Sequence, residues 1–307
     1  MQTCDTLLHA GVLLTQDDDR RVLENAALAI DGGRIVALGY SQDVTAAWQA
    51  REILDLSGML VMPGLVNAHT HAAMTFLRGL ADDMPLMDWL QQKIFPVEQG
   101  LTPDLVRLGS LLGFAEMLRT GTTSCVDMYI FEAAVLEAAD KAGLRCLAGE
   151  GVFNFPSACC PDADAALACT REMAQRWAGH DRLHVAVMPH SVYTTTAAQL
   201  TACCELADEL GLPLHIHLAE TRQETALSLE QHGLRPVPHA DRLGLLRPGT
   251  ILAHVVDVDA DEIALLARRG VSVVHNPSSN MKLASGVAPV PAMLDAGVRL
   301  ALGSDGA

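Results

Sequence analysis

The chain has 307 residues, half of them apolar, which fits one large domain or two modest ones with ample material for a core. Lys and Arg number 21 against 37 Asp and Glu, so the formal net charge is −16. A chain this acidic lacks the basic surface that phosphate groups attract. Nucleic acid and anionic membranes are therefore excluded as expected partners.

The first residues, MQTCDTLLHAGVLL, have no basic region and place Asp5 and His9 where a signal peptide would be apolar. No apolar run approaches the roughly 18 residues of a membrane-spanning helix. The eight cysteines include two vicinal pairs and no CxxC spacing, which predicts reduced thiols without a disulfide framework or a thiolate zinc site. Together these features indicate a cytoplasmic protein.

Residues 1–58 are predicted to form short strands of a small β-sandwich domain. Two apolar runs, 27–30 and 34–38, flank the sequence Asp-Gly-Gly, which is typical of a hairpin. A second pair of runs flanks Ser57-Gly58, where another turn is expected.

From residue 59 the pattern changes to short apolar runs that alternate with helical stretches. Helices are predicted over 102–119, 131–142, 196–210 and 259–269, each ending at or near a glycine. Strands are predicted to begin near Leu65, Thr122, Arg145, Leu183, Pro213, Thr250, Val271 and Arg299. The alternation favours a parallel sheet covered by helices. Eight units over residues 59–307 match a (β/α)₈ TIM barrel of about 250 residues, although a doubly wound sheet fits the alternation too.

Two histidines directly follow the first of these strands, in His69-Thr70-His71. Residues i and i+2 of a strand point the same way, so both imidazoles can face one cation. An HxH pair alone is as often structural. Its place at the carboxyl end of a barrel strand, where barrel active sites lie, favours metal binding.

The other candidates also end strands. His215-Ile216-His217-Leu218-Ala219-Glu220 ends the fifth, with His217 as a third nitrogen ligand and Glu220 as a proton shuttle. His215 faces the same way one layer deeper, and we interpret it as a core histidine. His254 ends the sixth strand and Asp305 the eighth. Four different strands thus end in potential metal ligands. Chance would not place ligands at the ends of all four strands, which favours a hydrolytic metal centre on a barrel.

Five segments of the chain resemble the amidohydrolase superfamily, in the family's order and over essentially the whole chain: VMPGLVNAHTHAAMTFLRGLADDMPLMDWL, PHSVYT, HIHLAE, HNPSSNMKL and LGSDGA. More narrowly, they resemble the branch of 5′-methylthioadenosine/S-adenosylhomocysteine deaminases and their chlorohydrolase-like relatives. The resemblance implies one divalent metal, usually zinc, with iron, nickel or manganese as alternatives. Its implied ligands are His69, His71, His217 and Asp305.

The resemblance also implies roles around the metal. Glu220, His254 and Asp305 would be catalytic, with Glu220 protonating N1 of the ring and then the leaving amine. Glu98 would bind ribose hydroxyls and His190 would contact the nucleoside. Trp89 either lines a purine pocket or packs between helices. One departure is Glu150, where relatives of this type can carry an arginine; it leaves the substrate tail and leaving group open.

The function expected from these residues is deamination of an adenosine-type nucleoside, namely 5′-methylthioadenosine, S-adenosylhomocysteine or adenosine. The alternatives are deamination of guanine or another oxopurine, hydrolysis of a triazine substituent, and a metal-binding relative without activity. The expected partner is a small purine nucleoside. Because relatives are often dimers or larger, a homo-oligomer is a further expectation.

The last expectation concerns the end of the sequence. Proteins of this family continue well beyond Asp305, so the eighth helix and the rest of the small β domain are expected to be missing. The apolar faces left uncovered would then make residues 1–307 aggregation-prone and weakly active.

Overall fold

The computed structural model describes residues 1–81 and 84–306. Asp82 and Asp83, which belong to the longest of the five motifs, and Ala307, which ends the motif LGSDGA, lie outside the described residues. The chain forms two compact units, Met1–Gly64 and Leu65–Ala307. Their boundary falls six residues after the predicted one at residue 58, because strand β4 (Trp48–Val61) runs past that point.

The first unit is a four-stranded sheet in the order β3-β2-β1-β4 with one short helix, α1 (Ser41–Ala47). Strand β1 (Gln2–Leu14) pairs antiparallel with β2 (Val22–Asp31) and parallel with β4. The predicted hairpin between β2 and β3 (Arg34–Tyr40) is confirmed.

The turn predicted at Ser57-Gly58 is wrong, because both residues lie inside strand β4. The pairing of β1 with β4 shifts register between Ala10 and Val12, and a Cβ added to Gly11 would lie 2.2 Å from the Ser57 carbonyl oxygen. Gly11 and Gly58 therefore mark a β-bulge at which two backbones approach closely, rather than a turn.

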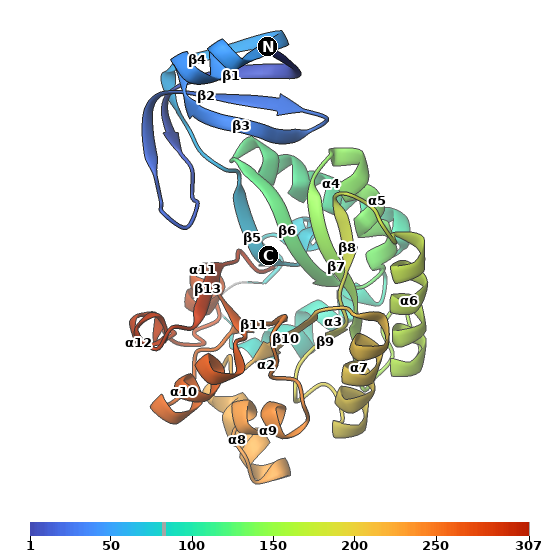
Figure 1. The fold of residues 1–307 in the computed structure, drawn as a ribbon. Helices are drawn as coiled ribbons and strands as arrows, with labels where there is room; N and C mark the ends of the chain where they lie inside the picture. The colour runs from blue at the N-terminus through green and yellow to red at the C-terminus, as the bar shows by residue number, and fades with distance from the viewer. Residues whose placement is uncertain (82–83, 307) are drawn as a thin grey trace. The chain divides into compact units, whose positions relative to one another are not determined.

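The second unit is a parallel barrel, as predicted (Figure 1). Within the described residues, eight strand positions begin at or one residue after the expected residues: β5 (Leu65–Thr70), β6 (Thr122–Tyr129), β7 (Arg145–Val152), β8 (Leu183–Val185) continued by β9 (Met188–Pro189), β10 (Leu214–Leu218), β11 (Thr250–His254), β12 (Ser272–His275) and β13 (Arg299–Leu302). Single bridges from Val187 to Leu214 and from Thr70 to Asp305 join the two halves of the ring. The closed ring excludes the doubly wound alternative.

Helices lie outside the strands, and Figure 1 shows α4 to α7 along the β5–β8 half. Their bounds are α4 (Pro103–Arg119), α5 (Glu132–Ala142), α6 (Ala163–Arg176), α7 (Ala197–Leu210), α8 (Arg222–His232), α9 (Pro236–Arg242), α10 (Ala260–Arg269), α11 (Pro277–Lys282) and α12 (Val290–Asp295). Thr102 caps α4 by accepting a hydrogen bond from the Leu105 N–H. None of the helices within residues 1–81 and 84–306 has the length and apolarity to cross a bilayer.

Short helical turns follow the first barrel strand, where the sequence analysis placed no elements. They are η1 (Ala72–Leu77), α2 (Leu86–Trp89), the π-helical η2 (Leu90–Ile94) and α3 (Phe95–Glu98). This segment carries Trp89 and Glu98.

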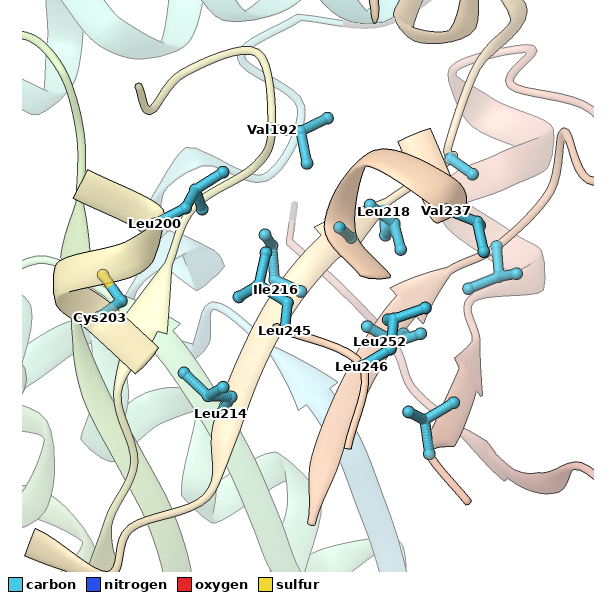
Figure 2. Packing of buried hydrophobic residues seen from close by; sticks show 14 of the residues in the cluster. Val192, Leu200, Cys203, Leu214, Ile216, Leu218, Val237, Leu245, Leu246 and Leu252 are labelled. Atoms are coloured by element: carbon cyan, nitrogen blue, oxygen red, sulfur yellow. The ribbon is translucent and has the colours of Figure 1, made fainter. Parts of the chain in front are cut away.

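The core packing fixes which strand residues face inward. Leu214, Ile216 and Leu218 of β10 are buried among side chains of neighbouring helices and loops, as Figure 2 shows. Because side chains alternate along a strand, the residues between them, His215 and His217, point to the barrel interior. Burying the leucines and isoleucine thus orients the two imidazoles.

Candidate metal centre and active site

Residues from four barrel strands meet at one buried point. His69 (β5), His217 (β10), His254 (β11) and Asp305 (after β13) each offer a ligand atom, and these atoms all lie within 4.8 Å of one another. His71 lies beside them, with its Nε2 3.1 Å from Asp305 Oδ1. The structure therefore brings together all four sequence-predicted ligands and adds His254 to the group.

Each imidazole uses its Nδ1 on a partner outside this point. Nδ1 of His217 is 2.8 Å from the His190 carbonyl oxygen, and Nδ1 of His71 contacts the Met128 carbonyl oxygen. Nδ1 of His254 is 3.0 Å from Asn280 Oδ1. A carbonyl oxygen only accepts, so Nδ1 carries the proton and Nε2 presents its lone pair to the centre.

The lone pair on Nε2 of His69 faces the carboxylate of Asp305, which is itself an acceptor. Nε2 of His69 is 3.2 Å from Asp305 Oδ1, yet among the described residues it has no hydrogen-bond partner. Lone pairs and a carboxylate that converge in a buried site repel one another unless a positive charge lies between them. Three imidazoles and one carboxylate are also a donor set that zinc accepts. The arrangement fits a metal cation.

The pKa values agree with a site for positive charge. Burial lowers the pKa of His69 to about 4 and that of His217 well below its usual value, so both imidazoles are neutral and able to ligate. Burial opposes ionisation of Asp305, but the adjacent imidazoles of His69, His71 and His254 hold its pKa well below the usual range. Against burial, Asp305 raises the pKa of His71 to about 9.

His215 does more than fill the core. It is fully buried, as interpreted from the sequence, and its Nε2 lies 2.8 Å from Nδ1 of His69. A partner on Nδ1 fixes the ring orientation of His69. The i, i+2 spacing from His217 was the available signal, because it places His215 on the inward face one layer below the ligands.

Glu220 lies next to the ligand group rather than inside it. Its Oε2 is 3.7 Å from His254 Nε2, and its Oε1 accepts a hydrogen bond of 3.0 Å from Ser285. Burial raises the pKa of Glu220 above its usual value. A carboxyl group that holds a proton more readily than usual, beside a metal ligand set, can serve as a general acid and base.

The sequence analysis missed Glu224, whose carboxylate binds the backbone N–H groups of Glu220 and of the residue before it. Its two carboxylate oxygens accept hydrogen bonds from the N–H groups of Ala219 and Glu220, at 2.9 and 2.7 Å. Ala219 has φ 52°, a left-handed conformation that costs a non-glycine residue about 1–3 kcal/mol. Glu224 is itself buried, so it stabilises this strained peptide in a dry setting.

One cavity is lined by three of the predicted metal ligands, His71, His217 and Asp305, and by the predicted substrate contacts. Its lining includes Glu98, Trp89, His190, Glu220, His254 and Asp305, with apolar side chains such as Leu86, Ile94 and Phe153. Trp89 lines this cavity, and its indole also packs in the core. The imidazole of His190 stacks against Phe153, with ring centroids 4.8 Å apart, and burial lowers its pKa to about 3.

Glu150 has a structural role away from that lining. It accepts hydrogen bonds from the N–H groups of Phe131 and Glu132, at 3.1 and 3.0 Å, at the start of α5. It is not among the described residues that line the cavity. Glu150 therefore caps a helix and does not line the cavity.

Comparison with known proteins gives a consistent set of relatives. Residues 60–307 match the amidohydrolase family. A 5-methylthioadenosine/S-adenosylhomocysteine deaminase from Desulfovibrio desulfuricans is 62% identical over 100% of this chain and 70% of its own length. One from Lawsonia intracellularis is 56% identical over 100% of this chain and 69% of its own.

Among solved structures, an adenosine deaminase from Xanthomonas campestris with bound zinc superposes with a TM-score of 0.97. It is 42% identical over 99% of this chain and 70% of its own. An atrazine chlorohydrolase from Arthrobacter aurescens has a TM-score of 0.91 at 23% identity, over 98% of this chain and 72% of its own. The second similarity is one of fold alone.

We expect His69→Ala and His217→Ala each to lose bound metal, because each removes a nitrogen ligand from the centre. Elemental analysis of the purified variants measures this directly. The control is His232→Ala, which changes a histidine that stacks on His239 instead. Full metal content in both ligand variants would show that the cation binds elsewhere.

We expect His215→Leu to weaken metal binding by about 10–100-fold, the usual effect of removing the partner of a ligand histidine. Leucine fills the space but leaves Nδ1 of His69 unpaired. The measurement is a competition titration with a chelator. An affinity equal to that of the unchanged chain would mean that packing alone orients His69.

Proposed function

The chain belongs to the amidohydrolase family, and from this membership we propose that it deaminates an adenosine-type nucleoside by hydrolysis. The products would be the inosine analogue and ammonia. The observation that carries the proposal is a buried carboxyl group, Glu220, beside a metal ligand set at the floor of a substrate-sized cavity. Relatives 56–62% identical are named 5-methylthioadenosine/S-adenosylhomocysteine deaminases, which supports the same reaction.

We propose that His69, His71, His217 and Asp305 hold one zinc ion, with His254 beside it. The zinc in the Xanthomonas campestris relative supports this choice over iron, nickel or manganese, which the same donors also accept. When bound, the metal lowers the pKa of a coordinated water toward 7, so that a nucleophile is supplied at neutral pH.

The protein groups would then move the protons. Nε2 of His254 lies 3.6 Å from Asp305 Oδ2 and 3.7 Å from Glu220 Oε2, which suits it to orient a water between the two carboxyl groups. Asp305 accepts the first proton of the water. Glu220, with its raised pKa, would give its proton to N1 of the ring as C6 is attacked. It would then take up the proton held by Asp305 and pass it to the leaving amine, and the hydroxyl group on C6 would return a proton to Glu220 as the carbonyl forms.

The rest of the cavity would select a nucleoside. Glu98 is partly buried in the lining, and burial raises its pKa, so a carboxylate there gains from the hydrogen bonds of two ribose hydroxyls. His190 is neutral at pH 7 because burial lowers its pKa, so it recognises the nucleoside by hydrogen bonding rather than by charge. Trp89 and its apolar neighbours bury the ring.

The alternatives have weaker support. Guanine deamination and triazine hydrolysis correspond to solved structures at only 23% identity, which speak for the fold. A metal-binding relative without activity would have no need for the buried Glu220 and its Ser285 hydrogen bond. Ammonia release from 5′-methylthioadenosine, S-adenosylhomocysteine, adenosine and guanine, together with chloride release from atrazine, tests all of these readings. Release from guanine or atrazine alone would refute the nucleoside assignment.

We expect Glu220→Gln to retain its metal and to lose at least about 10²-fold in kcat, the usual value of a positioned acid–base group. The amide keeps the shape of the side chain and cannot carry the proton. Elemental analysis and turnover of adenosine measure the two effects. Glu230→Gln, at an exposed position of α8, is the matched control. A variant with near-normal kcat would remove Glu220 from the mechanism.

We expect adenosine to exceed adenine in kcat/KM, and Glu98→Ala to reduce this preference by about 10–100-fold. Hydrogen bonds to a charged group contribute about 1.5–3 kcal/mol, and adenine offers the Glu98 carboxylate no ribose hydroxyl. Steady-state assays of both substrates give the ratio. Glu209→Ala, which removes an exposed carboxylate paired with Arg171, controls for charge. Equal loss on both substrates would assign Glu98 to the fold rather than to the sugar.

A further inference from the structure

A second set of metal-ligating side chains lies away from the hydrolytic centre. The thiols of Cys159, Cys160 and Cys169, here called the thiol cluster, have Sγ atoms that all lie within 4.8 Å of one another. Sγ of Cys160 and Sγ of Cys169 are 3.7 Å apart. None of the three is among the described residues that line the active-site cavity.

Local structure holds the thiol cluster together. Cys159 and Cys160 end a tight turn after β7, in which Ser157 Oγ accepts from the Cys160 N–H at 3.0 Å. Cys169 lies on α6, whose first turn is capped by Asp162. Cys160 is 4% exposed, whereas Cys159 and Cys169 are partly exposed, so a cation could enter from solvent.

The spacing of the sulfur atoms fits a metal site. A cation bound at about 2.3 Å from each sulfur separates the sulfurs by about 3.8 Å in a tetrahedron and about 4.0 Å in a flat triangle. The 3.7 Å separation and the 4.8 Å limit bracket these values. Small rotations of the cysteine side chains would therefore bring the three sulfur atoms to the separations that a bound cation needs.

Other cysteines of the chain form pairs without a third thiol. Sγ of Cys125 and Sγ of Cys146 are 3.6 Å apart, and both residues are buried. Cys203 and Cys204 are vicinal on α7. Within residues 1–81 and 84–306, only Cys159, Cys160 and Cys169 form a group of three thiols close enough to share a cation.

The protonation state argues for binding rather than reactivity. The Cys160 thiol and then burial raise the pKa of Cys159, and burial raises that of Cys169. Such thiols are weak nucleophiles at neutral pH. A cation that forms strong bonds to sulfur displaces their protons on binding.

We propose that the thiol cluster binds one soft cation, monovalent copper or zinc, through three sulfur atoms. Soft thiolate ligands select such cations, and the three sulfurs that this group of described residues offers suit a trigonal site or one completed by water. Binding releases three protons and changes no oxidation state. The bound cation ties the loop after β7 to α6. That loop continues from Phe153, which lines the active-site cavity.

The test uses Cd²⁺ as a soft probe on the reduced full chain, after its hydrolytic centre has been loaded with zinc. Thiolate bound to Cd²⁺ gives a sulfur-to-metal absorption in the ultraviolet, which imidazole and carboxylate ligands do not give. We expect this absorption to saturate at one equivalent. Cys160→Ser and Cys169→Ser each remove a sulfur ligand. Each variant should bind Cd²⁺ at least about tenfold more weakly, since losing even the hydrogen-bond partner of a ligand has an effect of that size. Cys204→Ser, the vicinal-pair control, should match the unchanged chain.

A second measurement needs no variant and covers the case in which a serine variant fails to fold. Alkylation of the native chain, read by mass spectrometry, should show Cys159, Cys160 and Cys169 protected when one Cd²⁺ is bound. The proposal is wrong if no thiolate absorption appears at stoichiometric Cd²⁺ or if Cys160→Ser binds as tightly as the unchanged chain. A disulfide between Cys160 and Cys169 that persists under the reducing conditions would also overturn it.

Discussion

The convergence of acceptor atoms at the carboxyl ends of the barrel strands is the constraint on which the site depends. Nε2 atoms of three imidazoles and the carboxylate of Asp305 meet within 4.8 Å in a buried space. Such a group is unfavourable without a cation, because its buried atoms are acceptors that face one another. The surrounding groups keep it from rearranging: carbonyl oxygens of Met128, His190 and Asn280 hold the Nδ1 protons on the far side of the rings.

Burial of apolar side chains in the barrel offsets the backbone strain at the site. His254, Asp305 and Ala219 all adopt left-handed conformations at strand ends, at about 1–3 kcal/mol for each strained residue. Directly before Ala219, the fully buried leucine and isoleucine side chains of β10 each contribute about 1.5–3 kcal/mol. Strain and burial therefore lie next to each other on one strand. The alternation that buries Ile216 and Leu218 also aims His217 at the centre.

The parts of this structure that follow from local patterns could be predicted, and the parts that depend on distant partners could not. Strand starts and the ligand histidines were found because apolar runs and their terminal residues are local. The hydrogen bond of His215 to His69 joins residues 146 positions apart, and that of His254 to Asn280 joins residues 26 apart. The spacing of residues along the sequence does not predict such long-range hydrogen bonds. The turn predicted at Ser57-Gly58 failed because a glycine marks turns and bulges alike. The spacing of the cysteines along the sequence did not suggest a thiolate zinc site, whereas the fold brings Cys169 to the vicinal pair Cys159-Cys160.

The two ligand sets differ in the charge that they give to a bound cation, and this difference suits different tasks. Three neutral imidazoles and one carboxylate leave a divalent ion with a net charge of about +1, so that a coordinated water stays acidic near pH 7. Three thiolates would leave the same ion at about −1, which removes most of the attraction for the electrons of the water. A hydrolytic centre therefore needs the histidine set, and the buried position that keeps His69 and His217 neutral is part of its chemistry. The thiol cluster, with its stronger bonds and lower residual charge, suits a cation that fixes a loop rather than one that activates water.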